Sequence, residues 1–518
     1  MQQSNEPLAV LVVLGVVVLA ALARRRWRPS TTASGTAHWA PESALQAAGM
    51  LGDAGLILGR TLSGKLIRLR EYCHLLLVGA TGAGKGVSII IPNLLSYVRG
   101  SLVCFDPKGD LYAVCGKRLA ARGRRVVRLA PFNGGADRLN PLDLIRADDP
   151  MLVDHARALA EALVVRLGTE HDPHWNDKAV QVICALLTLV LMRFQGEERS
   201  LNAVQEIASD PVLLAAAADQ LRAMGGIPAR LGSQLGALFD KQQPGVLSKE
   251  GAGVLSTVQR HLSFLDSELV AKSAAASTFD PRELLGGRMT LFLQIPPDQL
   301  EAQKGLLRCW VSTLVRMIGA AGDERQSEVL FLLDEASALG SLAAVEEALV
   351  RGRSAGVRML LAYQSDSQVQ AAFKDKPTLL YDNCTTQIYL GASGIETAER
   401  ISKSLGEWTQ VLEGYGENTS RAWNTGSYSP GQGEQRTQGG SVNYSVAGRA
   451  LLRPEEVLRL SDRWLIAFQR GMAPILAQRI RWYRDPAFNP AVGRGSMLLC
   501  WGLLASAAVL AAWALIPR

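Results

Sequence analysis

The sequence predicts an α/β fold in which a doubly wound parallel sheet carries a phosphate-binding loop and is interrupted by an all-helical insertion. Three observations support this prediction. An apolar run at residues 75–78 leads into a glycine-rich loop, another at residues 329–333 leads into paired carboxylates, and the stretch from 147 to 285 has helical periodicity. Apolar runs near both ends of the 518 residues predict a membrane-spanning helix at each end.

Composition defines the broad class of the protein. Hydrophobic residues make up 48% of the chain and charged residues 20%, which is typical of a folded protein with a large core. The net charge of +7 is compatible with nucleic acid or an anionic membrane as a partner and requires neither. The 7 cysteines are scattered and none stands in C-x-x-C spacing, which argues against a disulfide framework and against a zinc site.

The N-terminal segment, residues 1–28, is expected to be a membrane anchor. Leu8 to Ala23 is apolar throughout, and arginines follow at positions 24, 25, 26 and 28. A secretory signal peptide carries its positive charges before the apolar region, so this order indicates an uncleaved anchor with the body of the protein in the cytoplasm. A buried core helix is the alternative. Residues 29–70 are expected to form a tether and the start of the folded region.

Residues 79–85 carry the G-x-x-x-x-G-K pattern of a phosphate-binding loop. Its glycines let consecutive backbone N–H groups point at a phosphate, and the following helix adds the positive end of its dipole. We expect Lys85 to contact the β- and γ-phosphates of a nucleotide; a glycine-rich turn that binds nothing is the alternative. Gly86 stands where a Ser or Thr normally ligates Mg²⁺, and Ser88 is no simple substitute because two helical positions differ by about 200°. The predicted nucleotide-binding residues are Gly79, Ala80, Thr81, Gly82, Ala83, Gly84, Lys85, Gly86 and Val87.

Paired carboxylates form the second part of the predicted site. Asp334 can hold the water shell of Mg²⁺, and Glu335 can orient or deprotonate the water that attacks the γ-phosphate. A second strand, 101–105, ends in Asp106. How the metal is held stays open, with Asp334 and Asp106 as candidates. We expect the nucleotide-binding domain to comprise residues 71–146 and 286–486.

The strand beside the carboxylate strand supplies further candidates. Gln364 follows the predicted strand 357–362, where an ATPase can sense the γ-phosphate. Arg351 and Arg353 could reach the nucleotide of a neighbouring subunit as an arginine finger, although solvated surface arginines fit the sequence at least as well. Residues 411–447 are rich in Gly, Ser, Thr, Asn and Gln and are expected to form a mobile loop.

The insertion and the C-terminus each allow two interpretations. His171 and His174 could suggest a metal site, but no other clustered ligand accompanies them, so a loop leading into a helix is the stronger interpretation. Within residues 487–518, Met497 to Ile516 contains no charge and is long enough to span a bilayer, with an amphipathic or core helix as the alternative. Two spans around a cytoplasmic body would put both termini outside the cytoplasm.

These motifs, in this order, resemble those of the TraG-like coupling proteins of type IV secretion and conjugation systems. The resemblance covers roughly residues 72 to 486. A glycine after the lysine of the phosphate-binding loop is usual in that family, which fits Gly86. The matching stretches are GATGAGKGVSIIIPNLL, CFDPKGDLY, LNPLDL, DPHWNDKA, GVLSTVQRHLSFLD, LFLLDEASALG, GRSAGVRMLLAYQS and LLRPEEVLRL.

The resemblance implies a RecA-like ATPase domain with an all-α insertion, assembled as a ring of six and anchored in the inner membrane. It implies ATP and Mg²⁺ as cofactors, with Lys85 on the phosphates, Asp334 on the metal, Glu335 activating water and Gln364 as the sensor. The implied partners are a single DNA strand bound by a relaxase, or effector proteins, and the inner-membrane components of the secretion system. Family members usually have two N-terminal spans, whereas this sequence predicts one at each end.

Three functions are open at this point. The first is an ATP-hydrolysing motor that moves DNA across the inner membrane. The second is a docking receptor that binds ATP and substrates but hydrolyses slowly, an alternative that Gly86 keeps open because it supplies no hydroxyl for Mg²⁺. The third is an FtsK-like chromosome pump, which is disfavoured because the apolar C-terminal helix leaves no room for a DNA-reading domain after it.

Overall fold

The computed structural model describes residues 32, 34–135, 137–166, 172–243, 245–373, 376–422, 435–490 and 492. These residues fall into two compact units. The larger unit lies within Ala40–Thr397 and Arg459–Arg518, and the smaller one within Met1–Trp39 and Ala398–Leu458. Both predicted membrane spans, residues 8–23 and 497–516, lie outside the described residues, so they stay predictions.

An 11-stranded sheet forms the centre of the larger unit, in the order β2-β1-β13-β12-β9-β3-β8-β7-β4-β6-β5. The strands from β9 to β5 run parallel, which confirms the predicted parallel sheet. The other four extend it by antiparallel pairs. The strands are β1 (Leu56–Arg60), β2 (Leu66–Leu69), β3 (His74–Val78), β4 (Ser101–Phe105), β5 (Arg125–Leu129), β6 (Met289–Leu293), β7 (Val329–Leu333), β8 (Val357–Tyr363), β9 (Cys384–Tyr389), β12 (Trp464–Gln469) and β13 (Ile475–Gln478).

The parallel strands form where the sequence has short, continuous apolar runs. Every position of β3, β4, β6, β7 and β8 is buried, as expected for strands covered on both faces. The chain passes from β3 through a helix to β4, and β8 and β7 lie between these two strands in the sheet. The carboxyl ends of the four strands therefore meet at one edge of the sheet, where polar residues follow each of them.

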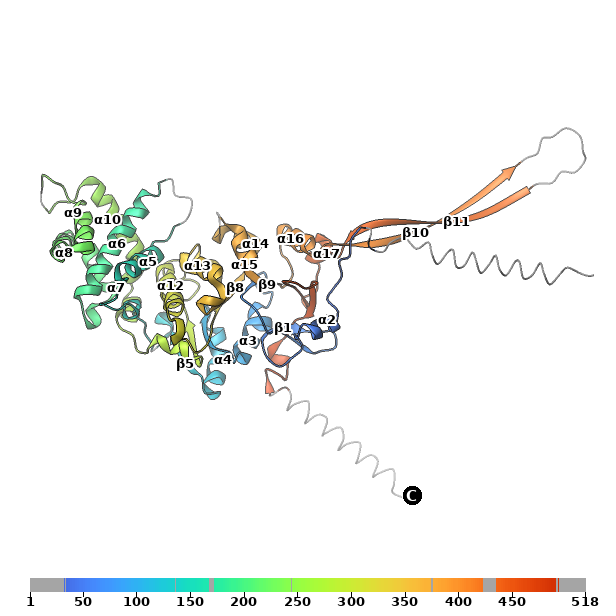
Figure 1. Cartoon of the computed structure of the whole chain (residues 1–518), viewed down its shortest axis with the longest axis horizontal. Coiled ribbons are helices and arrows are strands. Elements are labelled where there is room, and N and C mark those ends of the chain that lie inside the picture. The colour runs from blue at the N-terminus through green and yellow to red at the C-terminus, as the bar shows by residue number, and fades with distance from the viewer. Residues whose placement is uncertain are drawn as a thin grey trace, which may run out of the picture. The chain divides into compact units, whose positions relative to one another are not determined.

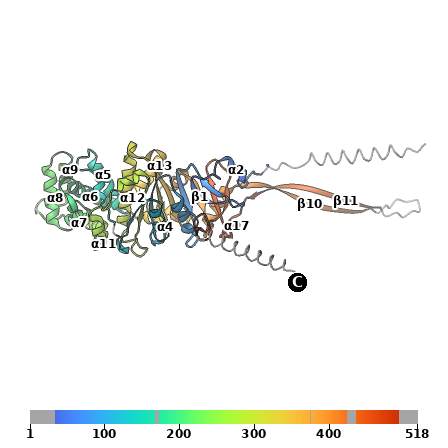
Figure 2. The same cartoon turned by 90° about the horizontal axis from the view of Figure 1, so that it is seen from below.

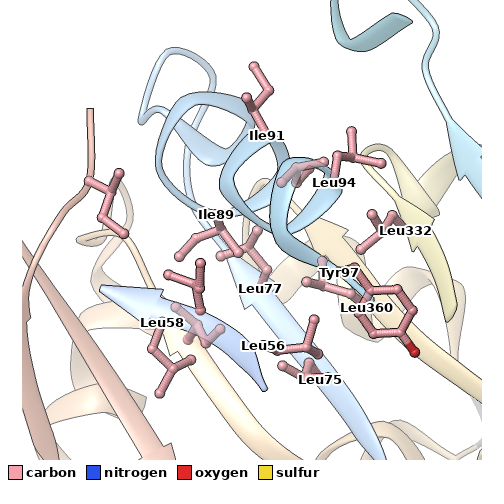
Figure 3. Packing of buried hydrophobic residues seen from close by; sticks show 14 of the residues in the cluster. Leu56, Leu58, Leu75, Leu77, Ile89, Ile91, Leu94, Tyr97, Leu332 and Leu360 are labelled. Atoms are coloured by element: carbon pink, nitrogen blue, oxygen red, sulfur yellow. The ribbon is translucent and has the colours of Figure 1, made fainter. Parts of the chain in front are cut away.

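One face of the sheet packs against the helix that follows the phosphate-binding loop. Leu75 and Leu77 of β3 share this face because alternate side chains of a strand point to the same side. Figure 3 shows them close to Ile89 and Leu94 of the following helical segment, with Leu332 of β7 in the same cluster. Burying each such side chain contributes about 1.5–3 kcal/mol. The cluster therefore fixes the helix, and with it the end of the loop, on the sheet.

Helices account for most of the described residues between 147 and 285. Helices α5 to α10 gather beside α12 in Figures 1 and 2, and α5 contacts α12. They belong to the larger unit, so a separate insertion domain stays a prediction. The helices of this unit are α2 (Glu42–Ala47), α3 (Ile91–Ser96), α4 (Asp110–Ala121), α5 (Leu152–Leu163), α6 (His174–Arg193), α7 (Leu201–Ser209), α8 (Pro211–Ala223), α9 (Gly226–Gly236), α10 (Lys249–Leu262), α11 (Glu268–Ala275), α12 (Lys304–Ala320), α13 (Ala343–Arg351), α14 (Asp366–Ala372) and α15 (Pro377–Asn383).

The long helix α6 is the core of this helical stretch. It begins at His174, as expected for a loop that leads into a helix, and the ring of His174 lies 3.1 Å from the carboxylate of Glu250. His171 lies outside the described residues. Among the residues that the structure describes, α6 is the one helix long and apolar enough to cross a membrane, yet 72% of its apolar window is buried inside the protein. This burial is typical of a core helix.

The smaller unit is dominated by a long antiparallel ribbon. Its two strands pair from Glu407 opposite Ala450 to Ala422 opposite Gln435, and Figure 1 draws them as one extended hairpin. The predicted loop over 411–447 is therefore corrected for the described residues. Strand pairing uses backbone groups, which need no aliphatic alternation, so the polar composition concealed these strands. The remaining elements are α16 (Ile395–Leu405), β10 (Glu407–Ala422), β11 (Gln435–Ala450) and α17 (Pro454–Leu458).

Candidate nucleotide-binding site

A cavity of about 670 Å³ lies where β3, β4, β7 and β8 end. Parallel strands bring their carboxyl ends to one edge, and ligands of doubly wound sheets bind outside that edge. Most of the predicted site residues line this cavity, including the phosphate-binding loop. The lining residues from the predicted set are Ala80, Thr81, Gly82, Gly84, Lys85, Gly86, Val87, Asp106, Asp334, Glu335 and Gln364.

The phosphate-binding loop has the backbone that its glycines allow. Gly82 and Gly84 have φ of +78° and +85°, a region that side-chain-bearing residues rarely adopt. The Lys85 ammonium donates to the Gly79 carbonyl at 2.8 Å, which folds the side chain over the loop. The loop is thus a closed turn whose lysine lies next to the cavity.

The helix after the loop begins with an unusually wide turn. The N–H of Ile91 bonds to the carbonyl of Gly86, five residues back, so residues Gly86–Ile90 form a π-helical turn before α3. Pro92 has no N–H to donate, which removes one regular helical bond at this point. A Cβ added at Gly86 would meet Leu111 at 3.7 Å, an ordinary contact. Steric space therefore does not explain why the chain has glycine here.

The two candidate metal ligands differ in what already contacts them. Asp106 is 1% exposed, and its oxygens accept from the N–H groups of Leu111 and Tyr112 and from Gln294 Nε2. Asp334 Oδ1, in contrast, is shielded from solvent and has no hydrogen-bond partner among the described residues. Asp106 thus caps the start of α4, whereas Asp334 retains an acceptor for a cation or its water.

Burial also makes the ionised form of Asp334 costly. It raises the pKa of Asp334 to about 6, and the neighbouring Glu335 and Asp106 act in the same direction, while the Lys85 ammonium opposes them. Burial raises the pKa of Asp106 as well, although its three hydrogen bonds counteract the effect. A divalent cation beside Asp334 would relieve this cost. The donor set at Asp334 therefore fits Mg²⁺ held by one carboxylate and by water.

Glu335 belongs to a small hydrogen-bond network over the cavity. The amide of Gln364 donates to its two carboxylate oxygens, at 3.3 and 3.1 Å, and the Ser337 hydroxyl donates to Oε1 at 2.6 Å. Gln364 in turn accepts from the Thr81 hydroxyl at 3.0 Å. The network joins the ends of β7 and β8 to the phosphate-binding loop. A ligand on the loop can therefore alter the orientation of both Gln364 and Glu335.

Arg351, the first of the two arginine candidates, is not brought to this cavity. Arg351 is exposed at the end of α13 and is absent from the cavity lining, and Arg353 lies in the short turn that follows. Sequence reasoning also missed three residues around the site. Ser337 and Gln294 bond to carboxylates of the site, and Arg479 bonds to the phosphate-binding loop. Ser337 lies in the matching stretch LFLLDEASALG, two residues after Glu335, but no role was expected for it. No motif marks Gln294 or Arg479, because their contacts join strands and loops that are far apart in the chain.

Comparison with known proteins gives a consistent result. The model of the family "Type IV secretory system Conjugative DNA transfer" matches residues 38–498. The protein VirD4 of Rhizobium radiobacter is 27% identical over 470 residues, 87% of this chain and 64% of that protein. The conjugal transfer protein TraG of Escherichia coli is 25% identical over 530 residues, 92% of this chain and 80% of that protein. The chain thus spans less than two thirds of the VirD4 relative.

A solved structure shows the same fold. The plasmid coupling protein TrwB in complex with ADP and Mg²⁺ superposes with a TM-score of 0.58 at 20% identity, over 88% of this chain and 96% of that one. Together with the mostly parallel central sheet, this likeness identifies the fold as an α/β RecA-like ATPase fold.

Proposed function

Because the chain belongs to the type IV secretory system conjugative DNA transfer family, we propose that it is an inner-membrane coupling ATPase of a type IV secretion or conjugation system. It recruits a single DNA strand bound by a relaxase, or effector proteins, and uses ATP hydrolysis to drive their transfer to the secretion channel. The family match includes every residue of the candidate site and the whole helical stretch.

The observation that supports this function best is the meeting of four side chains at one cavity, those of Lys85, Asp334, Glu335 and Gln364. Lys85 binds the β- and γ-phosphates. Glu335 orients the attacking water and accepts its proton, a role for which its contact with Gln364 holds it in position. Gln364 bonds to both Glu335 and Thr81, so it is placed to respond to the γ-phosphate and to pass that response to Glu335.

Mg²⁺, when bound, would supply positive charge to offset the negative charge of the phosphates. Asp334 is the residue that we propose to hold this ion, because its Oδ1 has no other partner among the described residues. Asp106 instead positions α4 and the turn before it. The ADP and Mg²⁺ in the TrwB complex support both cofactors.

We further propose a ring of six subunits anchored in the inner membrane by the apolar segments 8–23 and 497–516. In the ring, Arg351 or Arg353 serves the nucleotide of the adjacent subunit. The exposure of Arg351 and its absence from the cavity lining of its own chain support this role, since an arginine finger acts across an interface. The helical stretch 147–285 is the insertion domain where substrates enter from the cytoplasm.

The proposal is tested by ATP hydrolysis with the full-length protein in lipid nanodiscs, with and without single-stranded DNA. We expect DNA to stimulate turnover, and both Lys85→Ala and Glu335→Gln to abolish the stimulation. If the wild type binds MgATP but its turnover equals that of Glu335→Gln with DNA present, the motor function is wrong. The docking receptor that hydrolyses slowly is then the better account.

A further inference from the structure

One strand of the antiparallel extension of the sheet, β13, ends at the edge of the sheet where the candidate nucleotide-binding cavity lies. β12 pairs antiparallel with β9, and β13 pairs antiparallel with β12, so β13 runs in the same direction as β9 and β3. Its carboxyl end therefore lies at the same edge as the phosphate-binding loop. Arg479 is the residue that follows this end.

The guanidinium of Arg479 joins the loop to the extension. Its Nη1 donates to the Ala83 carbonyl at 2.9 Å, and its Nε donates to the Trp464 carbonyl at the start of β12. The backbone N–H of Arg479 bonds to Arg463 at 2.8 Å, which fixes the base of the side chain. Because the guanidinium is planar and its donors point in fixed directions, it can serve two carbonyls at once in a way that an ammonium cannot.

The contact lies on the outer side of the loop. In a phosphate-binding loop the N–H groups turn toward the phosphate, so carbonyl groups such as that of Ala83 turn away from it. Arg479 is absent from the cavity lining, in agreement with a position behind the loop. Ala83 stands between Gly82 and Gly84, the two loop residues in the left-handed region. Glycines lose the most backbone entropy on ordering, so a hydrogen bond from outside the loop stabilises this segment more than it would a segment without glycines.

We propose that Arg479 is a positioning residue that holds the phosphate-binding loop in its nucleotide-binding conformation by tying Ala83 to β12. The inference rests on the function proposed above and deepens it. It assigns the antiparallel extension a role in nucleotide affinity, although that extension contributes no residue to the lining of the cavity among the described residues.

The test compares Arg479→Gln and Arg479→Lys with a matched control in the full-length protein. Arg481→Gln is the control, because Arg481 pairs with Asp462 at 3.1 Å on the surface. Among the described residues, Arg481 makes no hydrogen bond or ion pair with the phosphate-binding loop. Without nucleotide, hydrogen exchange of the peptide over residues 79–87 is expected to rise in Arg479→Gln. The Kd for MgATP is expected to rise about tenfold to hundredfold, which corresponds to one hydrogen bond from a charged donor.

Kinetics separate positioning from general loss of structure. KM is expected to rise with Kd while kcat changes less than about twofold, because bound nucleotide restores the loop geometry. Arg479→Lys is expected to lie between the wild type and Arg479→Gln, since lysine can reach one carbonyl only. Wild-type exchange and Kd in Arg479→Gln would overturn the inference. So would equal increases in exchange throughout the sheet, or the same effects in Arg481→Gln.

The outcome is distinct from a failure of the proposed function. If the wild-type protein does not bind MgATP while Lys85→Ala behaves identically, the ATPase proposal is wrong. The exchange measurement without nucleotide still decides whether Arg479 orders the loop.

Discussion

Replacing Asp334 with Asn is predicted to stabilise the metal-free protein while it removes the proposed Mg²⁺ ligand. Burial raises the pKa of this carboxyl from 3.8 to about 6. At 1.36 kcal/mol per pH unit, keeping the carboxylate ionised at neutral pH costs the folded state about 3 kcal/mol. Asparagine has nearly the same volume and no charge, so the variant avoids this cost. Function and stability are thus in conflict at this position.

The gain must depend on pH in a defined direction. A folded-state pKa above the unfolded value means that the carboxyl contributes stability fully below about pH 4, and that this contribution is lost as the pH rises through about 6. The variant lacks this titration. The difference in unfolding free energy between Asp334→Asn and wild type is therefore expected to be smallest near pH 4 and to reach about 2–3 kcal/mol above pH 7.

The assay is thermal and denaturant unfolding of both proteins at several pH values in the presence of EDTA. A gain of this size corresponds to a rise of several degrees in Tm. Asp106→Asn is the matched control, because its carboxylate accepts three hydrogen bonds and an amide cannot accept them all. Its free energy of unfolding is expected to fall by about 1 kcal/mol, because Asp106 no longer caps the start of α4. If Asp334→Asn is less stable than the wild type at pH 7.5, or if the difference does not depend on pH, the Asp334 carboxylate does not carry this electrostatic cost.

Two further predictions concern the neighbours of the proposed metal site. Gly86→Ser is expected to fold with an unchanged or slightly higher Tm, since the new Cβ would make an ordinary contact with Leu111. Its hydroxyl is expected to lower the Kd for Mg²⁺ severalfold in the presence of ADP, because it adds an oxygen ligand. An unchanged Mg²⁺ titration would contradict this. Gln294→Leu breaks the bridge from Arg128 to Asp106 and is expected to destabilise the protein by about 2–3 kcal/mol in urea unfolding, because it leaves both charged groups short of a partner. A wild-type midpoint would show that water replaces the amide without loss.

The parallel part of the fold could be predicted because its signals are local. Each buried strand is a short apolar run, and the motifs at 79–85 and 334–335 follow such runs directly. Parallel strands bring their ends to one edge, so the meeting of Lys85 with Asp334 followed from the pattern alone. The resemblance to TraG-like coupling proteins, which rested on the same motifs, is confirmed by the family match.

The antiparallel parts could not be predicted because their pairing is not local. Arg479 contacts Ala83 across 396 residues, and no spacing in the sequence encodes that contact. The hairpin of β10 and β11 was predicted as a loop because polar strands lack aliphatic alternation. The different roles of Asp106 and Asp334 could also be seen only in the structure. Both follow an apolar strand, and only their hydrogen-bond partners separate a helix cap from a free acceptor.

The most direct test of the central claim compares nucleotide binding with hydrolysis in Glu335→Gln. Glutamine keeps the shape of the side chain and its contact with Gln364 but cannot accept a proton from water. We expect a Kd for MgATP within about threefold of the wild type and a turnover at least about 100-fold lower. If the wild type hydrolyses ATP rapidly and Glu335→Gln matches its rate, the chemistry does not take place at the carboxyl end of β7, and the proposed site is wrong.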